Sequence, residues 1–207
     1  MHELAVIDDP LFMEHRAEAA HPERPERLAA ARQALERATL PVRPRVLAAR
    51  DASDEELTRV HGEDYVVELG RTAGSSGYWD EDTYFSAASA AAARRAAGAA
   101  ALLGDELVSG RARFGAALVR PPGHHARPDT AMGFCLFNNV AVAAATARAQ
   151  GVSRVMIVDF DVHHGNGTQV MFYADPHVLY VSLHQFPFYA GTGAADEVGV
   201  GTGKGYT

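Results

Sequence analysis

The 207-residue sequence contains a single cysteine, Cys135, so it cannot form an internal disulfide. Such a chain is typical of a reducing compartment. The N-terminus lacks a basic segment followed by an apolar one, so we expect no signal peptide. The alanine-rich stretch 87–103 is interrupted by Arg94 and Arg95 and is too polar to span a bilayer. We therefore expect a cytoplasmic protein that does not bind a membrane.

Positive charge is also scarce. Lys and Arg number 19 against 26 Asp and Glu, which gives a formal net charge of -7, and no basic run with interleaved aromatics occurs. We therefore expect no direct nucleic-acid binding. The glycine-rich stretch "GTGAADEVGVGTGKGYT" is not a phosphate loop, because Val198 occupies the position of the first glycine and Gly follows Lys204.

The hydrophobic pattern predicts one α/β domain. Helices are predicted at about 23–38, in two shorter pieces within 54–72, and from about 82 to Gly110. Three apolar runs follow at 113–125, 154–165 and 177–186, separated by a predicted helix at 138–151 and a shorter one within 167–176. Apolar strands that alternate with helices indicate βαβ units and a parallel sheet covered on both faces.

Polar residues follow the apolar run in "VMIVDFDVHHGNGT", where a buried strand should end. Asp161 and His163 are two residues apart, so in an extended chain their side chains point the same way. A carboxylate and an imidazole are suitable ligands for zinc, although a catalytic zinc takes three protein ligands. Asp159, one step earlier on the same face, is either a partner of a histidine or an oxygen ligand of a hard cation.

His124 and His125 follow a Pro-Pro-Gly turn, where one imidazole could act as a general base beside the other. Each strand-end residue also has a structural interpretation as a helix cap or a hydrogen-bonded turn residue. We expect His2, His15 and His177 to be surface residues, His61 to end a helix, and His164 to hydrogen-bond within its turn. The role of His184 stays open. We expect Cys135 to be a small buried apolar residue.

Four motifs together resemble the core of the zinc-dependent histone deacetylases and their bacterial relatives, which include histone deacetylase-like amidohydrolases, acetylpolyamine amidohydrolases and acetoin-utilisation proteins. The motifs are "RPPGHHA", "MGFCLFNNVAVAA", "DFDVHHGNGTQ" and "VSLHQF". "HPERPERL" and "DEDTYFSAASAAAARRAAGAA" fit the same family, and "DVHHGNGT" points to its class II branch. The resemblance implies a three-layer α/β fold of the arginase/deacetylase type, with a central, mainly parallel sheet flanked by helices.

The resemblance also implies roles for individual residues. Asp161 and His163 would be two of three zinc ligands, and His125 the general base and acid. His124 would be its tandem partner, with Asp159 behind it. Asn166 would stand behind His125, where some members have Asp, and should leave that histidine less basic. Zinc and, at a second site, a monovalent cation such as potassium would be bound. The cation would contact Asp159, Asp161, His163, Ser182 and Leu183.

Gly133 and Phe134 match one wall of the family's acyl channel, and Tyr189 lies where the opposing aromatic belongs. Ala190 replaces an expected proline beside it. The implied reaction is hydrolysis of the acetyl or acyl group from an acetylated lysine or polyamine, with release of acetate. Substrate choice and oligomeric state stay open, a homo-oligomer included.

The family's third zinc ligand, an Asp, and its transition-state tyrosine lie beyond "GKGYT". We therefore interpret residues 1–207 as the N-terminal portion of a single deacetylase domain, truncated at its C-terminus, with an exposed sheet edge and doubtful activity. The alternative is a non-catalytic truncated homologue that binds a cation or a partner. An arginase-like di-metal hydrolase is disfavoured, because only one Asp-x-His pair is backed by tandem histidines.

Overall fold

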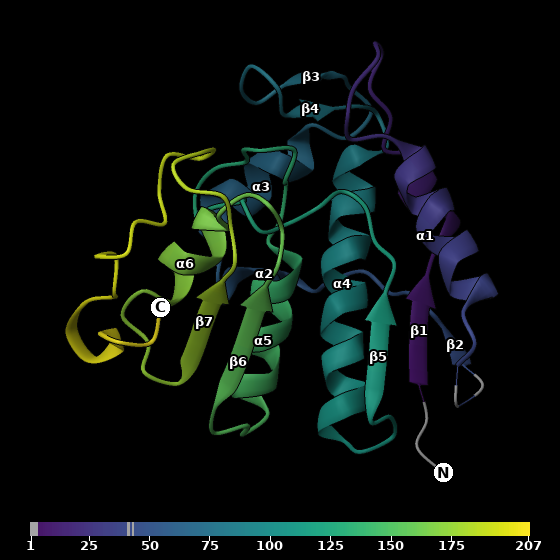
Figure 1. Ribbon diagram of the computed structural model, residues 1–207. Helices are drawn as coiled ribbons and strands as arrows, with labels where there is room; N and C mark the ends of the chain where they lie inside the picture. Colours follow the sequence, from purple (N-terminus) through teal and green to yellow (C-terminus); the bar gives the residue numbers. More distant parts are fainter. Residues whose placement is uncertain (1–3, 41, 43) are drawn as a thin grey trace.

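A computed structural model describes residues 4–40, 42 and 44–207. It has parallel strands flanked by helices (Figure 1). In chain order the elements are β1 (Leu4–Asp8), η1 (Pro10–Met13), α1 (Pro25–Arg37), β2 (Pro44–Ala48), α2 (Asp54–Thr58), α3 (Glu63–Arg71), β3 (Gly77–Tyr78), β4 (Tyr84–Phe85), α4 (Ser89–Val108), β5 (Phe114–Ala117), α5 (Asn139–Ala149), β6 (Val155–Asp159), α6 (Asn166–Phe172), β7 (Val178–Ser182) and η2 (Gly201–Gly203). His2 lies outside the described residues.

The three apolar runs all form parallel strands, as predicted, but they belong to two sheets. One sheet has the order β2-β1-β5, and the other pairs β6 with β7. Sequence analysis missed β1 and β2, and it missed that β5 pairs with β1 rather than joining β6. A short antiparallel pair, β3-β4, lies apart from both sheets.

Helices α4 and α5 pack against one face of the strands and against each other (Figure 1). Alanines on α4, among them Ala93, Ala97 and Ala101, form a buried cluster with Val142 of α5. On its other side α5 contributes Ala141 to the cluster that contains Ile157 of β6. Small side chains let α4 and α5 approach closely. Because α4 packs on β5 and α5 packs on β6, the two helices connect the two sheets. No helix in the described part of the chain is long and apolar enough to cross a membrane.

A buried ion pair anchors the turn that leaves β5. The guanidinium of Arg120 donates from Nε and Nη2 to the two carboxylate oxygens of Glu23, both at 2.6 Å. The Tyr84 hydroxyl donates to the same carboxylate at 3.0 Å. Burial alone would raise the pKa of Glu23, but the bonds from Arg120 outweigh it and hold that pKa below its usual value. The residues just after Arg120 lead directly to His124.

The expectation that His15 lies at the surface is wrong. His15 is fully buried, its Nδ1 lies 2.7 Å from the Ser89 hydroxyl, and its ring stacks on Tyr84 at 4.3 Å. The expectation that His61 ends a helix is also wrong: α2 ends at Thr58, and His61 lies buried in the turn before α3. It donates from Nδ1 to the Arg127 carbonyl at 3.0 Å, and Nε2 accepts the Asn138 N–H at 3.0 Å. His177 is exposed, as expected.

We expect Glu23→Gln to lower the free energy of unfolding by about 3–5 kcal/mol, because it leaves the buried guanidinium of Arg120 without a counter-ion. Urea unfolding measures the change. Glu26→Gln is the matched control: Glu26 lies in the same segment with its side chain 74% exposed, and its loss should cost less than about 0.5 kcal/mol. Equal effects of the two variants would contradict the structural role of the ion pair.

Stability should also fall as the pH drops from 6.5 towards 4. Burial lowers the pKa of both His15 and His61 from 6.5 to about 4. The unfolded chain therefore takes up protons in this window before the folded chain does, and each histidine costs up to about 3 kcal/mol. Urea unfolding at pH 7 and pH 5 tests this. His61→Gln should flatten the pH dependence, and an unchanged slope would refute the assignment.

Candidate active site

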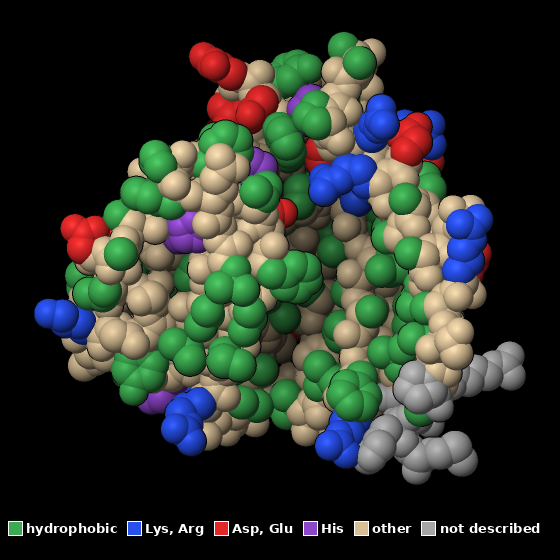
Figure 2. Space-filling view, viewed as in Figure 1, with side chains coloured by type: hydrophobic (Ala, Val, Ile, Leu, Met, Phe, Trp, Pro, Cys, Tyr) green, Lys and Arg blue, Asp and Glu red, His purple; other side chains and the backbone are tan. Residues whose placement is uncertain are grey.

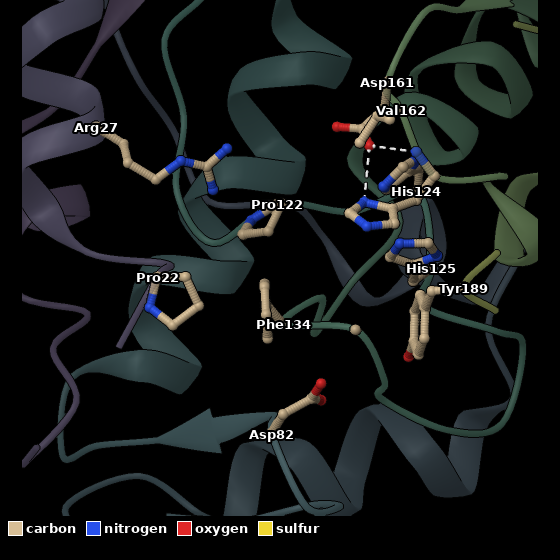
Figure 3. A pocket seen from close by; sticks show the side chains of 12 residues that line it. Pro22, Arg27, Asp82, Pro122, His124, His125, Phe134, Asp161, Val162 and Tyr189 are labelled. Carbon is tan, nitrogen blue, oxygen red and sulfur yellow. Dashed lines mark hydrogen bonds and ion pairs between the residues drawn. The ribbon is translucent and has the colours of Figure 1, made fainter. Parts of the chain in front are cut away.

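The ends of β5 and β6 meet at one pocket of about 540 Å³. His124 and His125 reach it from the turn after β5, while Asp161 reaches it from the turn after β6 (Figure 3). His163, from the same turn as Asp161, also lines the pocket. The two strands are not paired, but both are parallel strands with their carboxyl ends on the same side. This is where ligands bind in open α/β sheets. The structure thus brings the two predicted groups together.

The tandem histidines have different partners. His124 Nδ1 donates to Asp159 Oδ2 at 2.9 Å, and His125 Nδ1 donates to Asn166 Oδ1 at 2.8 Å. Both oxygens are acceptors only, so each ring carries its proton on Nδ1. The ring centroids are 4.0 Å apart. The predicted positions of Asp159 behind His124 and of Asn166 behind His125 match these contacts.

Burial and the neighbouring imidazole of His124 lower the pKa of His125 to about 4, and the bond to Asn166 only partly opposes them. His125 is therefore neutral at pH 7. Asp159 behaves differently: burial alone would raise its pKa, but the bond from His124 and further bonds, including one from Tyr180, keep it below its usual value. His124 thus faces a carboxylate, and His125 faces a neutral amide.

Asp161 and His163 contact each other. Asp161 Oδ1 accepts the His163 backbone N–H at 2.9 Å and its Nδ1–H at 3.1 Å. Both side chains are partly exposed to the pocket, at 44% and 34%. Their donor types, a carboxylate oxygen and an imidazole nitrogen, fit zinc. Within the described residues, however, no group of three or more His, Cys, Asp or Glu side chains is arranged to hold a metal ion.

The predicted channel residues line the same pocket. A Cβ on Gly133 would lie 2.4 Å from the His125 ring, so only glycine fits beside that ring. The Phe134 backbone N–H donates to the buried Thr83 hydroxyl at 3.1 Å, which ties this wall to the β3-β4 pair. Tyr189 stands edge-on to His125, with centroids 5.0 Å apart. Figure 3 shows Phe134 and Tyr189 on different sides of the pocket.

Three of the predicted cation-binding positions also lie together. Asp159 and Ser182 are partners in the β6-β7 register, and the Leu183 N–H donates to the Asp159 carbonyl at 2.9 Å. The side chain of Leu183 is a hydrocarbon without a ligand atom, so this residue could bind a cation only through its main chain. His184, whose role the sequence left open, lies 2.8 Å from the Ser182 hydroxyl through Nδ1.

Sequence reasoning missed Tyr180. Its hydroxyl donates to Asp159 Oδ2 at 3.0 Å. A Cβ on Gly165 would lie 2.3 Å from that carboxylate oxygen and 2.4 Å from the tyrosine hydroxyl, so the bond depends on glycine here. Tyr180 lies in an apolar strand, where its side chain gives no separate signal. Phe188, which stacks on His163 at 5.3 Å, was missed because it lies in a loop.

A second missed group fixes the loop that carries Tyr189. The expectation that the His164 side chain bonds within its own turn is wrong: its Nε2 lies 2.9 Å from Gln169 Oε1 in α6, and its Nδ1 lies 2.7 Å from the Thr192 hydroxyl. Glu197 accepts from Gln169 at 2.6 Å. Sequence reasoning gave no role to Gln169, Thr192 or Glu197.

Cys135 is buried without a disulfide, as expected. Burial raises the pKa of its thiol to about 12, so it is not a nucleophile. Three further residues line the pocket, Pro22, Arg27 and Asp82. They lie in the motifs "HPERPERL" and "DEDTYFSAASAAAARRAAGAA", but sequence analysis gave them no role.

The histone deacetylase domain family matches residues 21–207. The chain is 50% identical over 191 residues to histone deacetylase 15 of Arabidopsis thaliana, covering 90% of this chain and 35% of that protein. It is 45% identical over 200 residues to polyamine deacetylase HDAC10 of Homo sapiens, covering 89% of this chain and 30% of that protein. A probable deacetylase of Archaeoglobus fulgidus is 38% identical over 198 residues, with 95% of this chain and 55% of that protein covered.

Among solved structures, the HDA15 HD domain matches with a TM-score of 0.93 and 46% sequence identity, covering 99% of this chain and 60% of that chain. This chain thus spans between 30% and 60% of these four proteins. The match confirms the α/β fold with helices flanking parallel strands, as part of a domain. The chain belongs to the histone deacetylase domain family.

Proposed function

We propose that this chain carries the proton-transfer groups and two metal ligands of a zinc-dependent deacetylase, which hydrolyses the amide of an acetylated lysine or polyamine. The observation that carries the proposal is the pairing of the tandem histidines. His124 and His125 contact different oxygens, Asp159 and Asn166, and both face the pocket that Asp161 and His163 line.

His125 is suited to act as the general base. Its Nδ1 proton is held by Asn166, so Nε2 carries the lone pair and accepts the proton of an attacking water. The pKa of about 4 keeps the ring neutral and ready at pH 7. The same low pKa makes the protonated ring a strong acid, which then returns the proton to the leaving amine. Acetate and a free amine are the products.

His124 contributes charge and orientation. Its bond to the ionised Asp159 fixes the ring beside the reacting atoms. Asp161 and His163 would hold the zinc together with a further ligand. Bound zinc would supply polarisation of the amide carbonyl and a lower pKa for water. Gly133, Phe134 and Tyr189 shape the pocket around a linear acyl arm.

The substrate class follows from the relatives, of which one is named a histone deacetylase and another a polyamine deacetylase. Both substrates present an acetylated primary amine on an unbranched chain. We also propose that a monovalent cation such as potassium binds near Asp159, Ser182 and Leu183, and that the protein works in the cytoplasm, where its free thiol stays reduced.

A second candidate function is favoured by the two-ligand count: a non-catalytic homologue that binds a cation or a partner. The test compares two proteins. One is the 207-residue chain, and the other, called here the completed chain, joins residues 1–207 to the portion of the HDA15 HD domain beyond the match. Zinc content and hydrolysis of acetyl-lysine and acetylpolyamine are measured on both. Hydrolysis by the completed chain alone supports a catalytic role, whereas a zinc-loaded but inactive completed chain supports the alternative.

We expect His125→Ala in the completed chain to lower hydrolysis by about 100- to 10,000-fold, because the water loses its proton acceptor. The zinc content, measured by mass spectrometry, should not change, because His125 is not a ligand. His177→Ala, at an exposed histidine, is the control and should retain activity. Loss of zinc from the His125 variant would overturn the assignment of this residue as the base.

We expect Asp161→Asn to reduce zinc affinity by at least about 10-fold, because a charged ligand becomes neutral and the bond to the His163 ring weakens. Competition with a fluorescent chelator measures the affinity. Asp175→Asn is the matched control, since Asp175 accepts from the backbone N–H and Nδ1 of His177 in the same way outside the pocket. Unchanged affinity in the Asp161 variant would contradict the metal assignment.

A further inference from the structure

The segment after β7 carries Tyr189, one wall of the candidate active site, and residues 185–197 are called here the Tyr189 loop. It runs over the outside of the molecule at the left of Figure 1, and Figure 2 shows hydrophobic and histidine side chains exposed in the same region. The Tyr189 ring meets the rings of His125 and His163 edge-on, with centroids 5.0 and 5.9 Å apart. Such contacts are weak compared with hydrogen bonds to a charged group. The position of the Tyr189 wall therefore depends on how its loop is anchored.

The Glu197 carboxylate is an anchor of this loop. Its Oε1 accepts the consecutive backbone N–H groups of Gly193 at 3.0 Å and Ala194 at 3.1 Å. Its Oε2 accepts from Nε2 of Gln169 at 2.6 Å. Burial alone would raise the pKa of Glu197, but the bonds from the two backbone N–H groups and from Gln169 hold it below its usual value. The group that holds the loop is therefore a carboxylate at neutral pH.

Gln169 connects this anchor with the general base. It lies on α6, the short helix that begins at Asn166, and Oδ1 of Asn166 accepts from His125 at 2.8 Å. The amide oxygen of Gln169 lies 2.9 Å from Nε2 of His164, so both the oxygen and the nitrogen of this amide have partners. A chain of contacts thus runs from the base through α6 to the loop that carries Tyr189.

The loop is closely packed at Gly193. The φ angle of this residue is +87°, and a Cβ there would lie 2.4 Å from His184 Nε2 and 2.7 Å from His164 Cγ. Only glycine therefore lets the loop approach these two rings. Behind the loop, Gln169, Gly193 and Glu197 line a cavity of about 180 Å³. The loop has room to move into this cavity if its bonds to Glu197 are lost.

We propose that Glu197 and Gln169 are positioning residues, which hold the Tyr189 wall against the His125 ring and so set the width of the substrate channel. A narrow channel accepts an unbranched amine chain and excludes a branched one. Loss of the anchor lets Tyr189 move away from His125, so the channel widens and its selectivity for an unbranched chain falls. The effect on selectivity rests on the proposed function, whereas the position of Tyr189 does not.

The position of Tyr189 is measured by NMR on the completed chain, without zinc or substrate. Nuclear Overhauser effects between the Tyr189 and His125 rings should fall by at least about 3-fold in Glu197→Ala, because the effect decreases steeply with distance. Asp196→Ala is the matched control: Asp196 is the acidic neighbour of Glu197 and is exposed, so its loss should leave the ring contact unchanged. An unchanged contact in folded Glu197→Ala would overturn the proposal.

An exchange of the two side chains separates positioning from general stability. Glu197→Gln alone places two amide groups against each other and should weaken the ring contact. The double variant Gln169→Glu with Glu197→Gln exchanges the donor and the acceptor of the 2.6 Å bond, and an amide oxygen still faces the N–H of Gly193. The ring contact should then return to within about 2-fold of its original strength. No recovery in the double variant would count against a specific pairing of these residues.

Selectivity is measured by hydrolysis of acetyl-lysine and of an analogue with a methyl branch on the δ-carbon. The ratio of the two kcat/KM values should fall by at least about 5-fold in Glu197→Ala and stay unchanged in Asp196→Ala, since one methyl group in a fitted pocket changes kcat/KM by about 10- to 200-fold. KM for acetyl-lysine should rise more than kcat falls, because the reacting groups stay in place. An unchanged ratio would refute the effect on selectivity.

The two measurements separate this proposal from the proposed function. A completed chain that hydrolyses neither substrate would contradict the proposed function. The contact between the rings of Tyr189 and His125 would still decide the positioning role of Glu197, because that measurement uses neither zinc nor substrate.

Discussion

The close packing of α4 on α5 is the contact on which the site depends. The two sheets share no strand pair, so these helices set the distance between the end of β5 and the end of β6. Small side chains make this possible: Ala93 and Ala97 meet Val142, while Ala141 on the other side of α5 meets β6. A change in the distance between α4 and α5 would move the tandem histidines relative to Asp161. It would therefore change the shape of the pocket that these residues line.

The adjacent imidazoles of His124 and His125 have different hydrogen-bond partners and are buried to different extents. His124 bonds to a carboxylate that further donors keep ionised, while His125 bonds to a neutral amide and is more deeply buried. Burial is the largest cause of the low pKa of His125. The neighbouring imidazole of His124 lowers it further, and the bond to Asn166 only partly opposes both.

Sequence reasoning reached the strands after residue 113, the helices between them and the residues that line the pocket, because these segments carry strong periodicity and long motifs. It missed β1, whose residues 4–8 were considered only as a leader. It placed His15 at the surface, although that ring is buried against Tyr84. A single histidine between polar neighbours gives no sign of burial, since its partners Ser89 and Tyr84 lie about 70 residues away in the sequence. Contacts between residues far apart in the sequence become visible only in the fold, and so does the bond between Tyr180 and Asp159, which lie 21 residues apart.

The hydrophobic pattern of the strand at 155–159 differs from the burial observed in the structure. Its continuous apolar run predicted cover on both faces, yet the described chain covers only the face of Ile157. Exposed apolar side chains at Met156, Val158 and Phe160 cost free energy in water and gain nothing from their own sheet. The pattern is consistent with a strand whose second face is buried in a larger domain.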